Sequence, residues 1–159
     1  HSKNQSKLIM VTIVLLEPQI PPNTGSIARL CGATNTDLHI VGKIGFELSD
    51  KQLKRAGLDY WEYVRWEYFS DLDTYCKNIV QNERFHLLTT KSSRSYTSRK
   101  FLKGDYLIFG SETTGIDEAF LKKNWDHTCT IKMENQNIRS LNLAMSAGIV
   151  LYEALRQVD

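Results

Sequence analysis

The sequence predicts an α/β fold, an open, mostly parallel sheet with helices on both of its faces. Short apolar runs of strand length alternate with stretches of helical pattern along the chain, and proline or glycine follows several of the runs. This alternation is typical of parallel strands joined by crossover helices. At 159 residues, 42% hydrophobic and 24% charged, the chain suits a single soluble domain with one main core.

The first strand and helix are separated by prolines. The run Met10–Leu16 is apolar and β-branched, and Pro18, Pro21 and Pro22 come soon after it, so a buried strand is expected there. A helix should follow with Thr24 as its cap. Its core-facing stripe is formed by Ile27, Leu30 and Cys31 and fades into a polar residue at the next turn, so this helix is expected to be brief.

The remaining elements continue the alternation after a turn at Asn35 and Thr36. Further strands are expected at Asp37–Val41, Val64–Phe69, Arg84–Thr90, Asp105–Phe109 and Cys129–Met133. Further helices are expected at 49–61, Asp71–Val80, Asp117–Lys123 and Ser140–Gln157. The strand from Asp105 runs directly into a loop bounded by Gly110 and Gly115. Ligand loops of open α/β sheets lie at such strand ends.

The final helix is apolar around nearly its whole circumference. Leucine, isoleucine, valine, alanine, methionine and tyrosine fill most positions between Leu141 and Leu155. A helix of this kind is either buried in a large core or shared with a partner. In so short a chain the second is favoured, and we expect a homodimer buried through this helix and the one starting near Thr24.

Composition excludes several classes of protein. No apolar run reaches the roughly 18 to 20 residues of a membrane span, and the polar opening lacks the apolar centre of a signal peptide, so we expect a cytoplasmic protein without membrane contact. Residues 1–9 are expected to be a tag remnant or a frayed extension, with one domain at 10–159. The net charge of +2 is too mild to indicate nucleic-acid binding by itself.

The cysteines and histidines do not indicate a metal site. Both residue types are scattered, without ligand-like pairs: Cys31, Cys76 and Cys129; His39, His86 and His127. Neither a disulfide framework nor a zinc site is supported by such spacing. We expect buried thiols, packed histidines and no metal.

The loop Gly110-Ser-Glu-Thr-Thr-Gly115 has the two-glycine spacing of a phosphate-binding loop. Ile116 and Asp117, however, occupy the positions where that motif needs lysine and a hydroxyl. No strand leads into G-x-G-x-x-G, so an ordinary dinucleotide-binding fold is unsupported. Taken alone, the loop is either a tight turn that needs its glycines or a ligand loop.

Five stretches, in order along the chain, resemble one family: EPQIPPNTGSIARLC, LKRAGLDYW, LLTTK, DYLIFGSETTG and IRSLNLAMSAGIVLYEALRQ. They are similar to the SPOUT class of S-adenosylmethionine-dependent RNA methyltransferases. The similarity is strongest to its small single-domain group (TrmL- or YibK-like), which methylates the ribose 2′-hydroxyl of the tRNA wobble nucleotide. The resemblance runs from Met10 to Gln157.

The resemblance implies more than the residue patterns do. It implies that the C-terminal part of the sheet is threaded through a deep trefoil knot (the α/β-knot), which holds S-adenosylmethionine as cofactor. Such threading is a rare exception to the rules of chain connection. It also implies an obligate homodimer with active sites built from both chains, acting on the anticodon stem-loop of tRNA at cytidine or uridine.

Site residues follow from the matching motifs. The resemblance implies catalytic or orienting roles for Asn23, Arg29, Glu112, Ser140 and Asn142. It implies that the cofactor is held by Leu88, Thr89, Gly110, Ile131, Met133 and Ser140. Without the resemblance, Leu88 and Ile131 are simply strand core.

A role for Arg29 would explain the prolines that precede the first helix. Arg29 lies six residues after Asn23 and off the core-facing stripe, so the preceding prolines would present it in a fixed position. Because guanidinium rarely gives up its proton, we expect Arg29 to clamp the adjacent phosphate and stabilise the forming alkoxide. Direct action as a base, or a plain surface arginine, are the alternatives.

Contacts to tRNA phosphates are expected from Lys54, Arg55 and Arg139, which lie in family motifs. The basic, serine-rich loop with Lys91, Arg94, Arg99 and Lys100 is either a further RNA contact or a solvated connection. Tyr60 and Trp61 either stack on an unpaired base or belong to the core.

Two other functions remain open, a catalytically silent RNA-binding dimer and a nucleotide-phosphate enzyme that uses the GSETTG loop. The chain departs from the common family pattern at Ser111, where proline is usual, and at Ala144, where serine is frequent. Both positions lie beside the cofactor loops, so the departures bear on cofactor geometry more than on the class of reaction.

Overall fold

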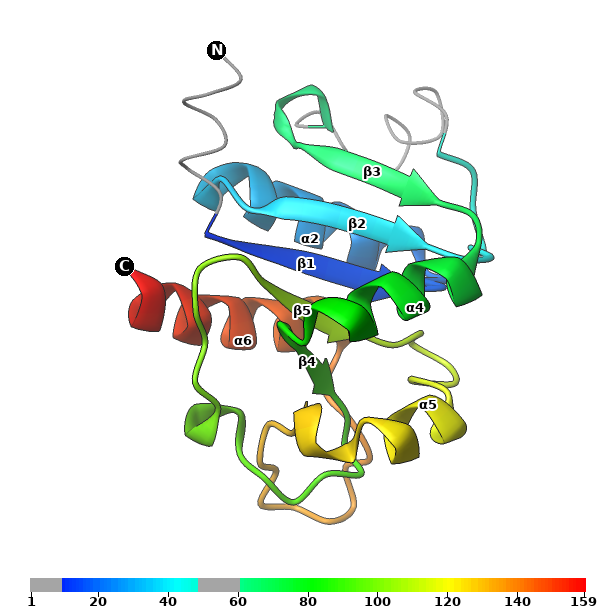
Figure 1. The fold of residues 1–159 in the computed structure, drawn as a ribbon. Helices are drawn as coiled ribbons and strands as arrows, with labels where there is room; N and C mark the ends of the chain where they lie inside the picture. Colours follow the sequence, from blue (N-terminus) through cyan, green and yellow to red (C-terminus); the bar gives the residue numbers. More distant parts are fainter. Residues whose placement is uncertain (1–9, 49–60) are drawn as a thin grey trace.

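A six-stranded, entirely parallel sheet forms the centre of the computed structural model, which describes residues 10–48 and 61–159 (Figure 1). Its strand order is β3-β2-β1-β5-β4-β6. The strands are β1 (Val11–Leu16), β2 (Asp37–Val41), β3 (Trp66–Phe69), β4 (Phe85–Leu88), β5 (Asp105–Phe109) and β6 (Thr128–Cys129). Every pairing is parallel, as the alternation of elements predicts.

Helices cover both faces of the sheet, which confirms the second part of the predicted fold class. The helices α2 (Pro21–Thr34) and α6 (Leu143–Val158) pack on one face, and α4 (Leu72–Asn82) and α5 (Glu118–Lys123) lie on the other (Figure 1). Successive residues of a strand point to opposite faces. Ile13 and Leu15 of β1 accordingly belong to the core under α2 and α6, and Val14 to the opposite core.

β1 lies between β2 and β5, and all six of its residues are buried. A strand covered on both faces and paired along both edges has no position for a polar surface residue. The mostly apolar run Val11–Leu16, in which Thr12 is a buried polar residue, is therefore the sequence signature of a central strand.

The predicted start and length of the first helix were wrong. α2 begins at Pro21, with Ile20 as its N-cap and prolines in the first two helical positions, where a missing N–H is no loss. Thr24 is buried inside the helix, and its hydroxyl has no hydrogen-bond partner among the described residues. The helix runs for 14 residues and ends where Asn35, its C-cap, takes the left-handed conformation. The polar Thr34 is accommodated in the last turn because its hydroxyl donates to the Leu30 carbonyl.

Several other boundaries shift. The last strand is limited to Thr128–Cys129 instead of Cys129–Met133, because the chain leaves the sheet after a single bridge between Thr130 and Ser95. α6 starts at Leu143 instead of Ser140, with Asn142 as its N-cap. β3 starts at Trp66 and β4 ends at Leu88, so both are shorter than predicted.

The predicted helix at 49–61 falls almost entirely outside the described residues, as do Lys54, Arg55 and Tyr60. Trp61 is described, and only 7% of it is exposed. Its ring lies 4.6 Å from that of Trp66, measured between centroids. Of the two alternatives for Trp61, stacking on a base or packing in the core, the structure therefore supports the core.

Cys31 and Cys129 are buried thiols, as predicted, but the prediction was wrong for Cys76, which is only partly buried. Burial raises the pKa of the Cys129 thiol to about 12, with Arg99 and Arg94 acting in the opposite direction. In residues 10–48 and 61–159, no three ligand-type side chains gather as a metal site would require. The helices of this same part of the chain are all too short or too polar to span a bilayer.

His86 of β4 is the centre of a polar cluster that includes the buried Asp105 of β5. Arg99 Nε donates to His86 Nδ1 at 2.9 Å, so the neutral ring carries its proton on Nε2 and donates it to Asp105 at 2.7 Å. Arg84 also donates to Asp105. Burial lowers the pKa of His86, and the positive charge of Arg99 adds to this, although the hydrogen bond to Asp105 acts against it.

This cluster predicts a pH-dependent stability. Below an ordinary histidine pKa of about 6.5, the unfolded chain takes up a proton that folded His86 resists, so the free energy of unfolding should decrease as the pH falls from about 7 to about 5. His86→Gln can still accept from Arg99 and donate to Asp105 but does not titrate, so it should flatten the profile. Urea unfolding across this pH range measures it.

His39 is the matched comparison, because burial also lowers its pKa. The variants His39→Gln and His86→Gln should each remove part of the slope, and the double variant most of it. An unchanged slope in His86→Gln would contradict the assignment.

Candidate active site

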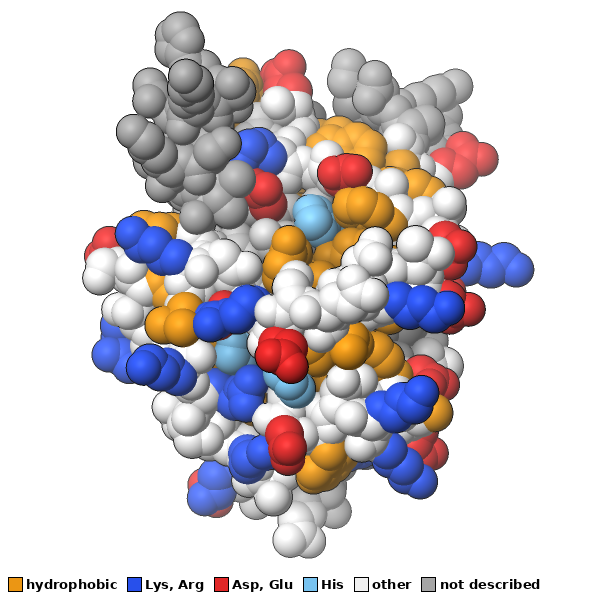
Figure 2. All heavy atoms as spheres, in the orientation of Figure 1, with side chains coloured by type: hydrophobic (Ala, Val, Ile, Leu, Met, Phe, Trp, Pro, Cys, Tyr) orange, Lys and Arg blue, Asp and Glu red, His pale blue; other side chains and the backbone are white. Residues whose placement is uncertain are grey.

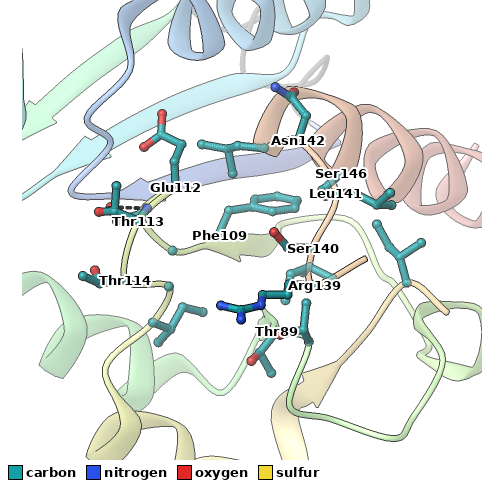
Figure 3. Close-up of a pocket in the computed structure, with 18 of the residues that line it drawn as sticks. Thr89, Phe109, Glu112, Thr113, Thr114, Arg139, Ser140, Leu141, Asn142 and Ser146 are labelled. Atoms are coloured by element: carbon teal, nitrogen blue, oxygen red, sulfur yellow. Dashed lines mark hydrogen bonds between the residues drawn. The ribbon is translucent and has the colours of Figure 1, made fainter. Parts of the chain in front are cut away.

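A pocket of about 560 Å³ opens where β4, β5 and β6 end (Figure 3). Its walls come from the loops that follow these strands and from the segment that leads into α6. Ile20 and Asn23, at the start of α2, complete it. This is the edge at which open parallel sheets bind their ligands.

The pocket brings together nearly all the site residues predicted from the sequence. These are Asn23, Leu88, Thr89, Gly110, Glu112, Ile131, Met133, Arg139, Ser140 and Asn142. Arg29 does not line it and lies further along α2 with its side chain exposed. Lys54 and Arg55 lie outside the described residues. In Figure 3, Glu112 and Asn142 stand on one side of the cavity, and Arg139 and Thr89 on the other.

Glu112 is hydrogen-bonded to the segment that begins α2. Its Oε1 accepts from the Gln19 backbone N–H at 2.8 Å, and its Oε2 accepts from the Ile20 N–H at 3.0 Å and from Asn23 Nδ2 at 3.2 Å. α2 has no capping side chain of its own. A carboxylate at a helix N-terminus is stabilised by the helix dipole, so Glu112 supplies from 92 residues away the capping that Ile20 cannot.

Asn23 is also hydrogen-bonded to Asn142, at the start of α6. Asn142 Nδ2 donates to Asn23 Oδ1 at 3.0 Å, and Asn142 Oδ1 accepts from the Met145 backbone N–H at 3.2 Å. Asn142 therefore caps α6 and holds Asn23 with the same amide group. The three predicted residues Asn23, Glu112 and Asn142 form one continuous hydrogen-bonded chain between two helix N-termini.

The glycines of the loop after β5 are required by its close folding. A Cβ added to Gly110 would lie 2.3 Å from the carbonyl carbon of Gly115, and Gly115 itself has φ of +69°. The Gly115 N–H donates to the Ser111 carbonyl at 2.9 Å, and the Ser111 hydroxyl accepts from the Thr113 N–H at 3.3 Å. Ser111 thus closes the turn through these hydrogen bonds.

Apolar and hydroxyl groups share the rest of the wall. Phe109 at the end of β5, Leu88, Ile131 and Leu141 provide apolar surface. Hydroxyl groups come from Thr113, Thr114, Thr130 and Ser146, which the sequence analysis did not select. Ser146 follows the N-cap Asn142 by four residues, so helical spacing would have placed it on the same side of α6.

Three charged side chains line the pocket: Lys91, Glu112 and Arg139. The hydrogen bonds of Glu112 are directed toward α2, whereas Arg139 extends toward the loop that carries Thr113 and Thr114 in the view of Figure 3. Arg139 is largely exposed at the mouth of the pocket. A guanidinium in this position can contact an anionic group on a ligand that enters.

The basic loop between β4 and β5 serves mainly the fold. Arg94 donates to the Trp125 carbonyl and, at 3.0 Å, to the Thr128 hydroxyl. Arg99 donates to His86 and to the Asp126 carbonyl. Both arginines therefore hold this loop against the segment around β6. Lys91 and Lys100 are exposed, and of this group only Lys91 lines the pocket.

Comparisons with known proteins find similar sequences along nearly the whole chain. A model of the SpoU rRNA Methylase family matches residues 10–152. A tRNA (cytidine(34)-2′-O)-methyltransferase of Methylovorus glucosotrophus is 46% identical over 151 residues, which cover 94% of this chain and 97% of that protein.

Solved structures show the same fold. One, described as giving insights into the 2-OH methylation of C/U34 on tRNA, has a TM-score of 0.84 at 37% identity and covers 93% of this chain and 95% of its own. The SpoU methyltransferase AviRb from Streptomyces viridochromogenes, in complex with AdoMet, has a TM-score of 0.78 at 22% identity, over 94% of this chain and 58% of its own.

The contacts of Glu112 predict a loss of stability on substitution. Glu112→Ala leaves two backbone N–H groups and the Asn23 amide without their acceptor, which should lower the free energy of unfolding by about 1 to 3 kcal/mol. Glu112→Gln keeps one acceptor oxygen and should fall between the alanine variant and the parent.

Glu118→Ala is the matched control. Glu118 is an exposed acid on α5 whose nearest cation, Lys122, is 3.9 Å away, so its loss should change stability by no more than about 0.5 kcal/mol. Urea denaturation compares the three variants. Equal stability of Glu112→Ala and Glu118→Ala would show that the helix is capped in some other way.

Proposed function

The chain belongs to the SpoU rRNA methylase family, and from this we propose that it transfers a methyl group from S-adenosylmethionine to the ribose 2′-hydroxyl of the wobble nucleotide, cytidine or uridine 34, of tRNA. The observation that carries the proposal is the gathering of the predicted cofactor and orienting residues around one pocket. The relatives that match nearly the whole chain support the substrate.

The residues of the pocket suit S-adenosylmethionine. A volume of about 560 Å³ lies within the ordinary range for ligand pockets. Phe109, Leu88 and Ile131 offer apolar cover for an adenine ring, and Thr89 and Ser140 offer hydroxyls to a ribose. The close folding at Gly110 keeps that wall free of a side chain, so backbone groups there can approach a ligand.

Bound in this pocket, the cofactor supplies a methyl group on a positively charged sulfur. The residues of the chain then have to align the 2′-oxygen with that methyl group, because orientation provides most of the acceleration in an in-line displacement. We assign this orienting role to Asn23, Glu112, Ser140 and Asn142. The hydrogen bonds among Asn23, Glu112 and Asn142 already hold three of them in place.

Arg29 is proposed to act in the active site of a second copy of the chain. It lies on the exposed side of α2 and does not line the pocket of its own chain. There it would clamp the phosphate beside the target ribose and stabilise the negative charge that develops on the 2′-oxygen. Arg139, with Lys54 and Arg55, would contact further tRNA phosphates.

We propose a homodimer formed through α6 and α2. Three apolar side chains of α6 remain exposed: Met145 at 64%, Ile149 at 38% and Tyr152 at 56%. They follow one another at helical spacing on one face. An apolar stripe of this kind marks an interaction surface, and α6 and α2 pack side by side in the chain.

A trefoil knot is also part of the proposal, within a single domain at 10–159. The segment after β6 lies against the loop that follows β4, since the Thr130 N–H donates to the Arg94 carbonyl at 2.8 Å and the Tyr96 N–H to the Thr130 carbonyl at 2.9 Å. The chain then continues to α6, on the opposite face of the sheet from α5. A passage of this kind is what the knot of the SPOUT class requires.

The function is tested by incubating the protein with S-adenosylmethionine and unmodified tRNA, followed by mass spectrometry of the nucleosides. The expected product is 2′-O-methylcytidine or 2′-O-methyluridine at position 34. Binding of ATP without binding of S-adenosylhomocysteine would instead indicate a nucleotide-phosphate enzyme. Binding of tRNA without product would indicate a silent RNA-binding dimer.

Arg29 variants test the mechanism. Arg29→Ala should lower the rate of single-turnover methylation roughly a hundredfold to a thousandfold and leave the affinity for S-adenosylhomocysteine unchanged. Arg29→Lys should restore little, because a point charge cannot make the planar two-pronged contact with phosphate. Lys122→Ala, which removes an exposed cation from α5, is the control. Parallel loss of cofactor binding would assign Arg29 a structural role.

The dimer is tested by charging its proposed interface. Ile149→Glu should shift the protein toward monomers in sedimentation velocity at micromolar concentration, because a carboxylate is costly to bury without a partner. Val80→Glu is the matched control, since Val80 on α4 is similarly exposed, at 36%, and lies on the opposite face of the sheet. Sedimentation of the parent protein as a monomer would contradict the proposal.

A further inference from the structure

A second cavity, of about 480 Å³, lies between α4 and the strands β2 and β3. Figure 2 shows this face of the molecule, where hydrophobic side chains gather over β2 and β3 beside α4. The cavity shares no lining residue with the pocket at the strand ends. The proposed methyl transfer does not use it.

Aromatic rings form the floor of this cavity. His39 lies at their centre, with ring centroids 4.9 Å from Phe69, 5.7 Å from Tyr75 and 6.0 Å from Tyr106. One hydrogen bond holds two of these rings in position, since His39 Nδ1 pairs with the Tyr75 hydroxyl at 2.7 Å. The result is a preformed, rigid aromatic surface of the kind on which planar rings stack.

A polar stripe from α4 forms the adjoining wall. Thr74, Asn78 and Asn82 follow one another at intervals of four residues and all line the cavity, so they lie on one face of the helix. Asn82 Oδ1 accepts from the Arg84 N–H at 2.9 Å. Within the described part of the chain the Asn78 carboxamide makes no hydrogen bond to another side chain or to the backbone. It can therefore donate to and accept from a ligand.

The charges around the cavity select against anions. Among the described residues, its lining contains one carboxylate, Asp71, and neither lysine nor arginine. Glu67 lies close enough to His39 to influence its ionisation electrostatically. Lys77 of α4 acts electrostatically on Asp71 but does not line the cavity. A phosphate group would therefore meet two carboxylates and one cation, so the chemistry of this cavity differs from that of an RNA backbone site.

We propose that this cavity binds a purine nucleoside, a planar heteroaromatic ring without a phosphate. The rigid aromatic floor provides the stacking surface. The Asn78 carboxamide pairs with the edge of the base, as asparagine does with the adjacent acceptor and donor of adenine. The excess of carboxylates over cations around the cavity favours the free nucleoside over the nucleotide. This inference is independent of the proposed function, because it concerns another cavity on another face.

Adenosine is the probe, and the measurement is a titration of the ¹⁵N-labelled protein followed by NMR. Adenosine should shift the side-chain amide signals of Asn78 and Asn82. Adenosine 5′-monophosphate should bind there roughly tenfold more weakly, as expected for about 1.4 kcal/mol of charge repulsion. Adenosine that occupies only the first pocket would shift Gly110 and Gly115 and leave the α4 signals unchanged, which would overturn the inference.

Two variants make the test specific. Asn78→Trp fills the cavity with an indole and should abolish the shifts of the remaining α4 signals. Gln81→Trp places the same indole on an exposed position of α4 that does not line the cavity, and adenosine should bind it as it binds the parent. Circular dichroism melting confirms that both variants fold.

Three outcomes contradict the proposal: unchanged binding in Asn78→Trp, equal loss in both variants, and binding of an unpaired oligoribonucleotide at the α4 signals more tightly than adenosine. The last would identify RNA, and not a free nucleoside, as the source of the base.

Discussion

The carboxylate of Glu112 is the contact on which the candidate active site depends. It accepts two backbone N–H groups from the segment before α2 and an amide hydrogen from Asn23. Asn23 is bound in turn by Asn142, the N-cap of α6. One carboxylate thereby joins the loop after β5 to the starts of two helices. Asn23 is buried, Glu112 is half-buried and Asn142 is exposed, and their hydrogen bonds tie the three segments together.

This network has a direct consequence for chemistry. Both helices begin at the pocket, and the positive ends of their dipoles point toward it. The pocket wall therefore combines fixed amides with the closely folded loop of Gly110 and Gly115. A reaction that depends on alignment more than on a strong acid or base needs such preorganisation.

The two faces of the sheet have different properties. The face under α2 and α6 ends in an exposed apolar stripe with Met145, Ile149 and Tyr152, which suits a second protein chain. The face under α4 carries a rigid aromatic surface centred on His39 and bordered by carboxamides, which suits a small planar ligand. The alternation of side chains along β2 separates the two, since His39 lies between Leu38 and Ile40 of the opposite core.

The residue patterns predicted the parallel α/β fold and the order of strands and helices along the chain. The resemblance of the motifs to a known family predicted most of the pocket residues. Apolar runs and the glycines or prolines between them indicate which short segments favour strand, helix or turn. The motifs indicate chemistry carried by residues close together in the sequence. Where the helices begin, and which residues lie in contact, depends on tertiary contacts that the local patterns do not contain. Thr24 was predicted as the cap because threonine is a favoured N-cap residue. In the structure, Glu112 from another loop accepts the N–H of Ile20, the actual N-cap residue, and the Thr24 hydroxyl is left without a partner among the described residues. Likewise, Cys129–Met133 has the composition of a strand, yet the chain leaves the sheet after Cys129, and Ile131 and Met133 line the pocket instead. Local composition cannot encode a contact such as that between Ile20 and Glu112, 92 residues apart. Such a contact stabilises the helix start only after folding has brought the two segments together.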